Sequence, residues 1–220
     1  MRDYVSPEFD SIALVSVDLQ RDVLEGQDFE VVGTSAAAEV TAALADAFRQ
    51  VGAPIIHVIR LYSEDGSNVD PCRRGAVEAG LKLLIAGSPG AEIAEGLLPH
   101  GAAFDAERLL AGEVLEVGPN EVVIYKPRWG AFYETPLAGH LRRLGVSSLA
   151  FCGCNFPNCP RTSIYEASER DFRVVIAVDG VSGLYDRGRD ELRAIGATLM
   201  AGEEIAASLR RKAGAVGRLS

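Results

Sequence analysis

Residues 147–171, SSLAFCGCNFPNCPRTSIYEASERD, constrain the fold of this chain more than any other stretch. A short apolar run that ends in glycine is typical of a buried strand. An irregular loop follows, and Cys159 then precedes Pro160, which suits the first turn of a helix because its missing N–H would have no partner there. Ile164 and Ala167 share one helical face, so a helix starts at or just after Cys159. The positive end of its dipole favours thiolate over thiol.

Four further apolar runs have the character of buried parallel strands, at residues 12–17, 54–59, 121–125 and 173–178. A helical pattern from Thr34 to Gly52 separates the first two. This alternation predicts right-handed βαβ units. We therefore expect an α/β fold, a doubly wound parallel sheet of five or six strands with helices on both faces. In such sheets ligands bind beyond the carboxyl ends of the strands.

Residues 62–120 break the alternation, with short helical patterns at 91–96 and 104–110. Long excursions of this kind commonly act as lids or oligomer contacts. The chain length predicts one domain, residues 1–220, with a lid or insertion at about 62–120. Residues 191–200 have an amphipathic helical pattern, and the basic segment from Arg210 is expected to be a frayed end.

Composition excludes several classes of function. The net charge of -9 disfavours nucleic acid and anionic membranes as partners. No apolar run approaches the roughly 20 residues of a membrane span, and the N-terminal residues lack the apolar core of a secretion signal. Three of the four cysteines fall within eight residues, a poor disulfide framework that suggests a reducing compartment. We expect a cytoplasmic protein.

Three reactive side chains follow or begin elements at the same predicted edge of the sheet: Asp18, Lys126 and Cys159. A thiol nucleophile needs a base that takes and returns a proton and a charge that stabilises the thiolate. Asp18 could serve as the base and Lys126 as the charge. Taken alone, each of these residues more often has a structural role, as a helix cap, a solvated cation or a small core residue. Cys152 and Cys154, in or beside the strand, are expected in the core.

The same residues resemble a known family. LVSVDLQRD around Asp18, VVIYKPRWGAF around Lys126 and FCGCNFPNCPRTSIYEA around Cys159 resemble, in this order, the isochorismatase-like cysteine hydrolases. That group includes nicotinamidases, N-carbamoylsarcosine amidohydrolases, ureidoacrylate and biuret amidohydrolases, and streptothricin hydrolases. The likeness covers roughly residues 12–200 and is weakest at 62–120.

The resemblance implies a catalytic triad of Asp18, Lys126 and Cys159. It also implies a cis peptide before Asn155, an oxyanion hole made by the N–H groups of Asn155 and Cys159, and a homo-oligomer, either dimer or tetramer. The family loop commonly has small residues and a threonine where this chain has NFPN at 155–158. The loop geometry and the shape of the pocket therefore stay open.

Two differences from the family pattern restrict the set of activities that can be expected for this chain. Nicotinamidases of this family bind a metal through an aspartate and spaced histidines after the second strand. Here the corresponding LYSEDGSN contains no histidine, and the whole chain has three, His57, His100 and His140. We therefore predict no metal and no cofactor. Isochorismatases cleave a vinyl ether without needing a thiol, so Cys159 favours amide chemistry but leaves vinyl ether hydrolysis as an alternative.

Two groups of residues are candidates for contacting the substrate. Aromatic side chains that could stack on a flat substrate, or pack under the lid instead, are Trp129, Phe132 and Tyr133. Polar side chains that could bind a carboxylate are Arg60, Tyr62 and the pair Arg73 and Arg74. Paired arginines are also typical of a solvated or interface face.

The predicted function is cleavage of a C–N bond in a small-molecule amide, carbamoyl or lactam substrate through a Cys159 thioester. The sequence does not identify the substrate. One alternative is a catalytically silent binding module, since folds of this type host many activities. Another is a structural zinc site at Cys72, Cys152, Cys154 and Cys159, although their C-x-C-x4-C spacing differs from the usual zinc patterns.

Overall fold

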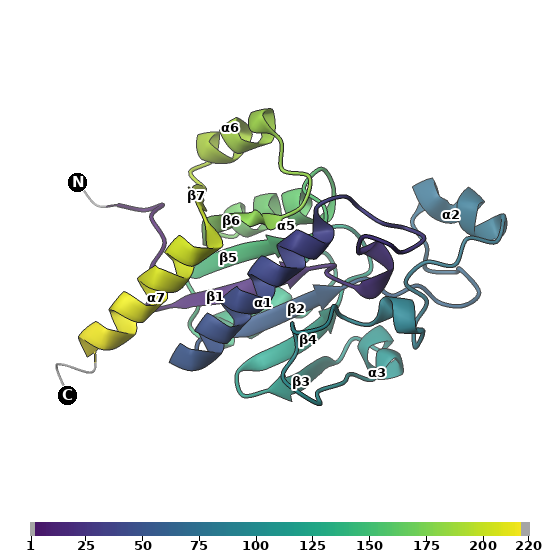
Figure 1. The fold of residues 1–220 in the computed structure, drawn as a ribbon, viewed down its shortest axis with the longest axis horizontal. Coiled ribbons are helices and arrows are strands. Elements are labelled where there is room, and N and C mark those ends of the chain that lie inside the picture. Colours follow the sequence, from purple (N-terminus) through teal and green to yellow (C-terminus); the bar gives the residue numbers. More distant parts are fainter. Residues whose placement is uncertain (1–2, 217–220) are drawn as a thin grey trace.

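The computed structural model describes residues 3–216, with side chains described as far as Arg211. Its centre is a seven-stranded sheet in the order β3-β4-β2-β1-β5-β6-β7 (Figure 1). The strands are β1 (Ile12–Val17), β2 (Ile55–Ile59), β3 (Val114–Gly118), β4 (Glu121–Tyr125), β5 (Ser148–Gly153), β6 (Arg173–Val181) and β7 (Thr198–Met200). β3 pairs antiparallel with β4, and the other neighbours pair parallel. The predicted doubly wound α/β fold is confirmed, with seven strands rather than five or six.

Helices cover both faces of the sheet. They are α1 (Thr34–Val51), α2 (Pro71–Glu78), α3 (Ala106–Leu110), α4 (Leu137–Arg143), α5 (Cys159–Ser168), α6 (Asp186–Ala194) and α7 (Gly202–Val216), with 3-10 turns η1 (Arg21–Val23) and η2 (Pro89–Ala91). Successive strand residues face opposite sides, so Leu14 packs with α1 and α7 while Val15 packs with α4 and α5. This two-sided burial explains the continuous apolar runs in the sequence.

Three predicted elements differ in the structure, each for a local reason. The pattern at 191–200 forms α6 and then β7, because Gly196 has a φ of 82° and ends the helix. Residues 92–96 form a bend and a turn rather than a helix after η2, where Ala94 N–H donates to the Leu19 carbonyl. The described part of the segment from Arg210 continues α7 to Val216, and residues 217–220 lie outside the described residues.

A buried charged cluster joins α1 to β2 and β4. Glu121 is 1% exposed, and its carboxylate accepts hydrogen bonds from Arg49 Nε at 2.8 Å and Arg49 Nη2 at 2.7 Å. His57 Nε2 lies 2.9 Å from the same carboxylate, and its Nδ1 lies 2.7 Å from Ser16 Oγ. His57 is therefore a satisfied core residue. Burial favours the neutral form of Glu121, but the bonds from Arg49 and His57 outweigh it and lower the pKa.

Removing the arginine from this cluster should destabilise the fold. In Arg49→Leu, Glu121 keeps its buried position but loses two charge-assisted bonds, so we expect the free energy of unfolding to fall by about 2–4 kcal/mol. Urea titration measures the change. Arg193→Leu is the matched control because its partner, Asp190, is exposed, and its expected cost is under about 1 kcal/mol. Equal losses in both variants would contradict this account of the cluster.

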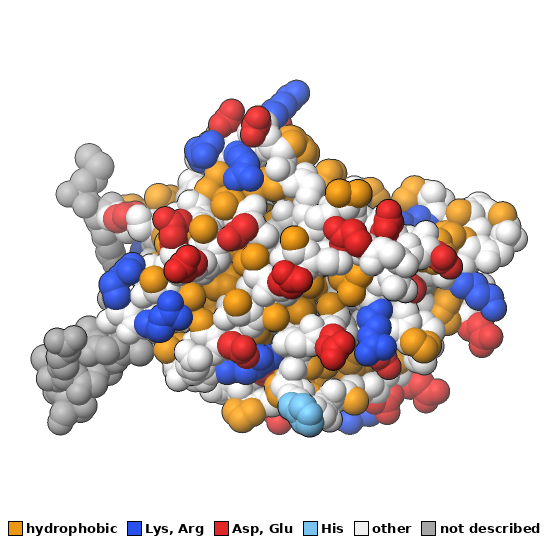
Figure 2. Space-filling view, in the orientation of Figure 1, with side chains coloured by type: hydrophobic (Ala, Val, Ile, Leu, Met, Phe, Trp, Pro, Cys, Tyr) orange, Lys and Arg blue, Asp and Glu red, His pale blue; other side chains and the backbone are white. Residues whose placement is uncertain are grey.

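Among the described residues, no helix is both long and apolar enough to cross a bilayer. Acidic and basic side chains are interspersed over the face that carries α1 and α7 (Figure 2).

Candidate active site

The candidate site lies where the strand order reverses. From β1 the sheet continues through β2 and β4 on one side and through β5, β6 and β7 on the other. The carboxyl ends of strands at such a point form the usual ligand crevice of open α/β sheets. Asp18 follows β1 directly, Lys126 follows β4, and Cys159 begins α5 after the loop that leaves β5. The three candidate catalytic residues thus gather at one edge of the sheet.

Asp18 and Lys126 form a buried ion pair. Lys126 Nζ lies 2.8 Å from Asp18 Oδ2, and the side chains are 0% and 9% exposed. Lys126 Nζ also donates to the Arg128 carbonyl at 3.1 Å. Burial acts to lower the pKa of Lys126, but the negative charge of Asp18 and its hydrogen bond outweigh it and raise the pKa. Lys126 is therefore a fixed positive charge. The second oxygen of Asp18, Oδ1, is buried without a hydrogen-bond partner.

The Cys159 thiol is protonated in the resting site. The residue is 8% exposed, and burial raises the pKa of its thiol to about 12, with the charge of Asp18 acting in the same direction and that of Lys126 in the opposite one. The helix terminus and Lys126 favour the thiolate, as the sequence indicated, but desolvation and Asp18 together outweigh them and raise the pKa. The proton must leave when the sulfur reacts, and Asp18 is the adjacent acceptor.

The loop before Cys159 carries two backbone donors that have no acceptor among the described residues. The Cys154–Asn155 peptide bond is cis, as the resemblance implied. Phe156 N–H donates to the Ser182 carbonyl and Asn158 N–H to the Asn155 carbonyl, which fixes the loop. The N–H groups of Asn155 and Cys159 make no such bond. Both free donors lie in the segment that carries the thiol.

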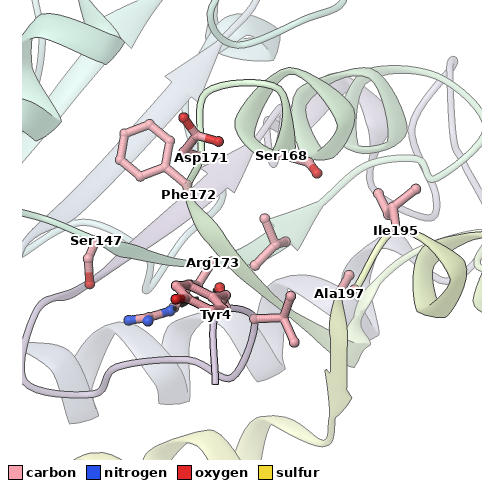
Figure 3. Close-up of a pocket in the computed structure, with 11 residues that line it drawn as sticks. Tyr4, Ser147, Ser168, Asp171, Phe172, Arg173, Ile195 and Ala197 are labelled. Atoms are coloured by element: carbon pink, nitrogen blue, oxygen red, sulfur yellow. Dashed lines mark hydrogen bonds between the residues drawn. The ribbon is translucent and has the colours of Figure 1, made fainter. Parts of the chain in front are cut away.

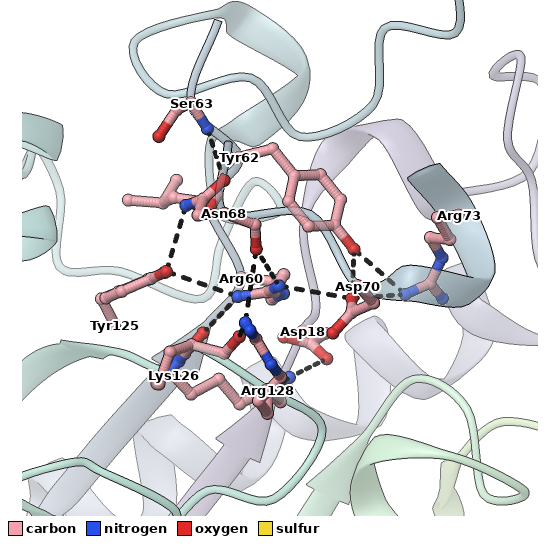
Figure 4. A network of polar contacts seen from close by, with 12 residues as sticks. Asp18, Arg60, Tyr62, Ser63, Asn68, Asp70, Arg73, Tyr125, Lys126 and Arg128 are labelled. Atoms are coloured by element: carbon pink, nitrogen blue, oxygen red, sulfur yellow. Dashed lines mark hydrogen bonds and ion pairs between the residues drawn. The ribbon is translucent and has the colours of Figure 1, made fainter. Parts of the chain in front are cut away.

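Arg60 and Tyr62 lie in a polar network that connects the Lys126 segment to α2 (Figure 4). Arg60 donates to the Lys126 carbonyl at 3.0 Å and to Asp70 Oδ2 at 3.3 Å, and Tyr62 OH donates to the same oxygen at 2.8 Å. Arg60 and Tyr62 are 3% and 1% exposed. Their candidate role in binding a substrate carboxylate is therefore replaced by a role in positioning Asp70.

Two of the three candidate aromatic residues face a hollow beside this network. Trp129 and Tyr133 line a cavity of about 470 Å³ between α2 and the start of α5. The residues that line it with them are Asp70, Pro71, Cys72, Arg128, Gly130, Thr162 and Glu166. Phe132 does not reach it, because this ring is buried and packs 5.9 Å from the ring of Phe172. The interpretation of Phe132 as a stacking partner is corrected to a core role.

A second hollow, of about 430 Å³, lies at the opposite edge of the sheet (Figure 3). Ser147, Phe172 and Arg173 line it at the amino ends of β5 and β6. The predicted site residues do not contribute to its wall. The candidate active site is therefore the carboxyl edge, where the thiol and the ion pair lie.

Sequence reasoning missed the residues that join the site's elements. Asp70 is the residue before α2, and the sequence Asp-Pro at a helix start was the available signal. Ser163 Oγ donates to the Cys159 carbonyl at 2.7 Å and accepts the Ala131 N–H at 3.0 Å. It thereby connects the thiol helix to the segment after Lys126, a tertiary contact that has no sequence signature.

The zinc alternative receives no support from the geometry. Cys152, Cys154 and Cys159 lie in three different hydrophobic clusters, and Cys72 is exposed on α2. Among the residues that the structure describes, no three histidine, cysteine, aspartate or glutamate side chains are grouped to hold a metal ion.

The family model described as the isochorismatase domain matches residues 12–204 of this sequence. The chain belongs to the isochorismatase family. An isochorismatase family protein from Desulfovibrio vulgaris has a similar structure, with a TM-score of 0.76 and 30% identity, covering 91% of this chain and 98% of that one. The predicted family and fold are thus confirmed.

Relatives in the isochorismatase family differ in the activity that their names state. A protein from Arabidopsis thaliana named as a probable inactive nicotinamidase is 27% identical over 76% of this chain and 77% of its own length. A ureidoacrylate amidohydrolase from Methylobacterium radiotolerans is 26% identical over 76% of this chain and 65% of its own. The name of the second relative supports the prediction of a hydrolase. The name of the first is consistent with the alternative of a catalytically silent binding module.

Proposed function

We propose that this isochorismatase-family protein is a cysteine hydrolase that cleaves a C–N bond in a small amide or ureido compound. The observation that carries the proposal is the buried Asp18–Lys126 pair beside the Cys159 thiol, at the edge of the sheet where ligands bind. A buried ion pair with one unpartnered carboxylate oxygen is expensive as a purely structural feature. Kinship with a named amidohydrolase supports the same reaction class.

In the first half of the reaction, Asp18 takes the thiol proton as the Cys159 sulfur attacks the substrate's carbonyl carbon. Lys126 stabilises the negative sulfur while the proton leaves. The carbonyl oxygen becomes an oxyanion, and the free N–H groups of Asn155 and Cys159 are the donors available to hold it. Asp18 then gives its proton to the leaving nitrogen as the C–N bond breaks, which leaves a thioester on Cys159.

In the second half, Asp18 acts as a general base toward water. Water adds to the thioester carbon and its proton passes to Asp18, the same two N–H groups hold the oxyanion, and the C–S bond breaks. The leaving sulfur recovers a proton from Asp18, so the products are a carboxylic or carbamic acid and an amine or ammonia. One carboxylate thus serves both halves of the reaction.

The thioester provides a direct test. We expect that mixing the protein with a panel of small primary amides and ureido acids gives at least one product heavier than its substrate by one water. Rapid quenching and peptide mass spectrometry should then find the acyl group on the Cys159 peptide, removable by hydroxylamine. A product without any Cys159 adduct would contradict the thioester route, and no product from any compound would favour the silent binding module.

A further inference from the structure

The loop that would hold the oxyanion, residues 154–158, is attached to the chain that leaves β6. Phe156 N–H donates to the Ser182 carbonyl at 2.8 Å, and Ser182 N–H donates to the Gly153 carbonyl at 3.1 Å. Ser182 Oγ also accepts a hydrogen bond from Thr34 Oγ1 at 3.1 Å, which ties the same point to the start of α1. Ser182 is 4% exposed, so these bonds are made away from solvent. The backbone in the middle of the loop is therefore fixed relative to the segment between β6 and α6.

The Phe156 side chain extends this attachment to α6. The ring is fully buried and packs edge-on against the Tyr185 ring, with the centroids 5.3 Å apart and the ring planes at 74°. Gly188, in the first turn of α6, is also buried and lies directly against the Phe156 ring. A Cβ at Gly188 would overlap Cε1 of that ring and would lie 3.0 Å from its Cζ. The close approach of α6 to the loop therefore requires a residue without a side chain at this point.

α6 is held against the ring at two further points, so the helix cannot simply move outward to accept a larger residue. Leu192 is fully buried in the same hydrophobic cluster as the ring. Arg161 on α5 donates to Tyr185 OH at 3.0 Å and to Glu191 Oε2 at 2.8 Å. Because Arg161 lies two residues after Cys159, these bonds connect α6 to the helix that carries the thiol. Added volume between α6 and the loop must therefore displace the Phe156 ring.

We propose that Gly188 is a positioning residue of the hydrolase, which lets α6 close on the Phe156 ring and thereby places the Asn155 N–H for the oxyanion. Asn155 directly precedes Phe156, so a displacement of the ring moves the peptide that carries this N–H group. A donor stabilises an oxyanion fully only within about 2.7–3.1 Å of it. The inference rests on the proposed function, because it concerns the oxyanion hole of the same reaction.

Two reagents that react with the same thiol distinguish the oxyanion hole from the nucleophile. In para-nitrophenyl acetate the sulfur attacks the carbonyl carbon, so an oxyanion forms before para-nitrophenolate leaves and the acetyl group stays on sulfur. In iodoacetamide the sulfur attacks the methylene carbon as iodide leaves, and no oxyanion forms. The thiol loses its proton in both reactions. Peptide mass spectrometry of samples quenched at early times measures both adducts on Cys159 and separates them from adducts on the exposed Cys72.

We expect Gly188→Ala to lower the ratio of the acylation rate to the alkylation rate at Cys159 by about tenfold, since a misplacement of about 1 Å can cost on the order of 10²-fold. The alkylation rate itself should change little. Gly139→Ala is the matched control, because it adds the same methyl group to α4, where the nearest atom is Arg143 Nη1 at 3.5 Å. Its ratio should equal that of the wild type, and circular dichroism verifies folding of each variant.

Phe156→Leu tests whether the effect of Gly188 passes through the ring. Leucine lacks Cε1 and Cζ, the two ring atoms that a Cβ at Gly188 would meet. Added to Gly188→Ala, this change should raise the ratio, whereas two independent defects would lower it further. Phe156→Leu alone should lower the ratio, because it withdraws the ring from α6, and this result is informative even if Gly188→Ala fails to fold.

The outcomes separate this inference from the hydrolase proposal. Equal ratios in the wild type and Gly188→Ala, or in the wild type and Phe156→Leu, would overturn the positioning role while acylation of Cys159 leaves the hydrolase proposal standing. A double variant with a lower ratio than Gly188→Ala would also overturn it. Absence of any acetyl adduct on Cys159 in the wild type would overturn the hydrolase proposal, and this inference with it.

Discussion

Replacing Cys159 by alanine should abolish hydrolysis while the fold is retained. The variant lacks the atom that forms the thioester, and the remaining donors cannot supply an equivalent nucleophile. Removing the nucleophile of a covalent hydrolase lowers turnover by about 10⁴-fold or more, so activity should fall below detection. The measurement is product formation by mass spectrometry with any substrate that the panel identifies.

The chain offers a matched control for this variant. Cys72 is exposed on α2 and lines the hollow beside the network, so Cys72→Ala removes a thiol near the site without touching the ion pair. We expect it to keep at least half of the wild-type rate. The side chain of Cys159 is buried, yet truncation to alanine removes a single sulfur, and the melting temperature should change little. Full activity in Cys159→Ala would contradict the mechanism.

The central strands were predictable because a strand that is buried on both faces has a continuous apolar run in the sequence. β1 and β5 are continuously buried, and their apolar runs have the same bounds to within a residue or two. The same argument located Asp18 and Lys126, since a reactive residue at the end of such a run lies at the ligand edge. This part of the site follows from strand order alone.

The outer elements of the fold have no comparable hydrophobic pattern in the sequence. β7 has three half-buried residues, and α2 contains no buried residue, so neither shows a continuous apolar run or an apolar stripe. The position of α2 depends on Asp70, whose partners Arg60 and Tyr62 come from the end of another strand. A contact of this kind is visible only after the chain has folded.

The pKa of the thiol could not be predicted from the sequence for a related reason. A helix start and a nearby lysine can be inferred from sequence, but the extent of burial around a sulfur cannot. In the folded protein, desolvation of the sulfur outweighs the effects of the helix start and of Lys126, and the pKa of Cys159 rises to about 12. In the proposed mechanism, Asp18 therefore removes a proton from the thiol in every turnover.

Replacing Asp18 by asparagine should therefore have opposite effects on two reactions of the same thiol. Hydrolysis should fall by about 10²–10⁴-fold, because an amide side chain cannot carry the proton from sulfur to the leaving nitrogen. Alkylation of Cys159 by iodoacetamide at neutral pH should become faster. The negative charge of Asp18 raises the pKa of the thiol, so its removal lowers that pKa and increases the thiolate fraction.

Lys126→Met should shift the pKa of the Cys159 thiol in the opposite direction from Asp18→Asn. Lys126 lowers the pKa of Cys159, so its loss should raise that pKa, slow alkylation and move its pH profile to higher pH. In Asp18→Asn the lysine keeps the thiolate as a partner for its buried charge, which reinforces the gain in reactivity. Site-resolved alkylation rates against pH, with circular dichroism to verify folding, measure both shifts. Slower alkylation in Asp18→Asn would contradict the expected charge effect of Asp18 on the thiol pKa and would show that this carboxylate also removes the thiol proton during alkylation.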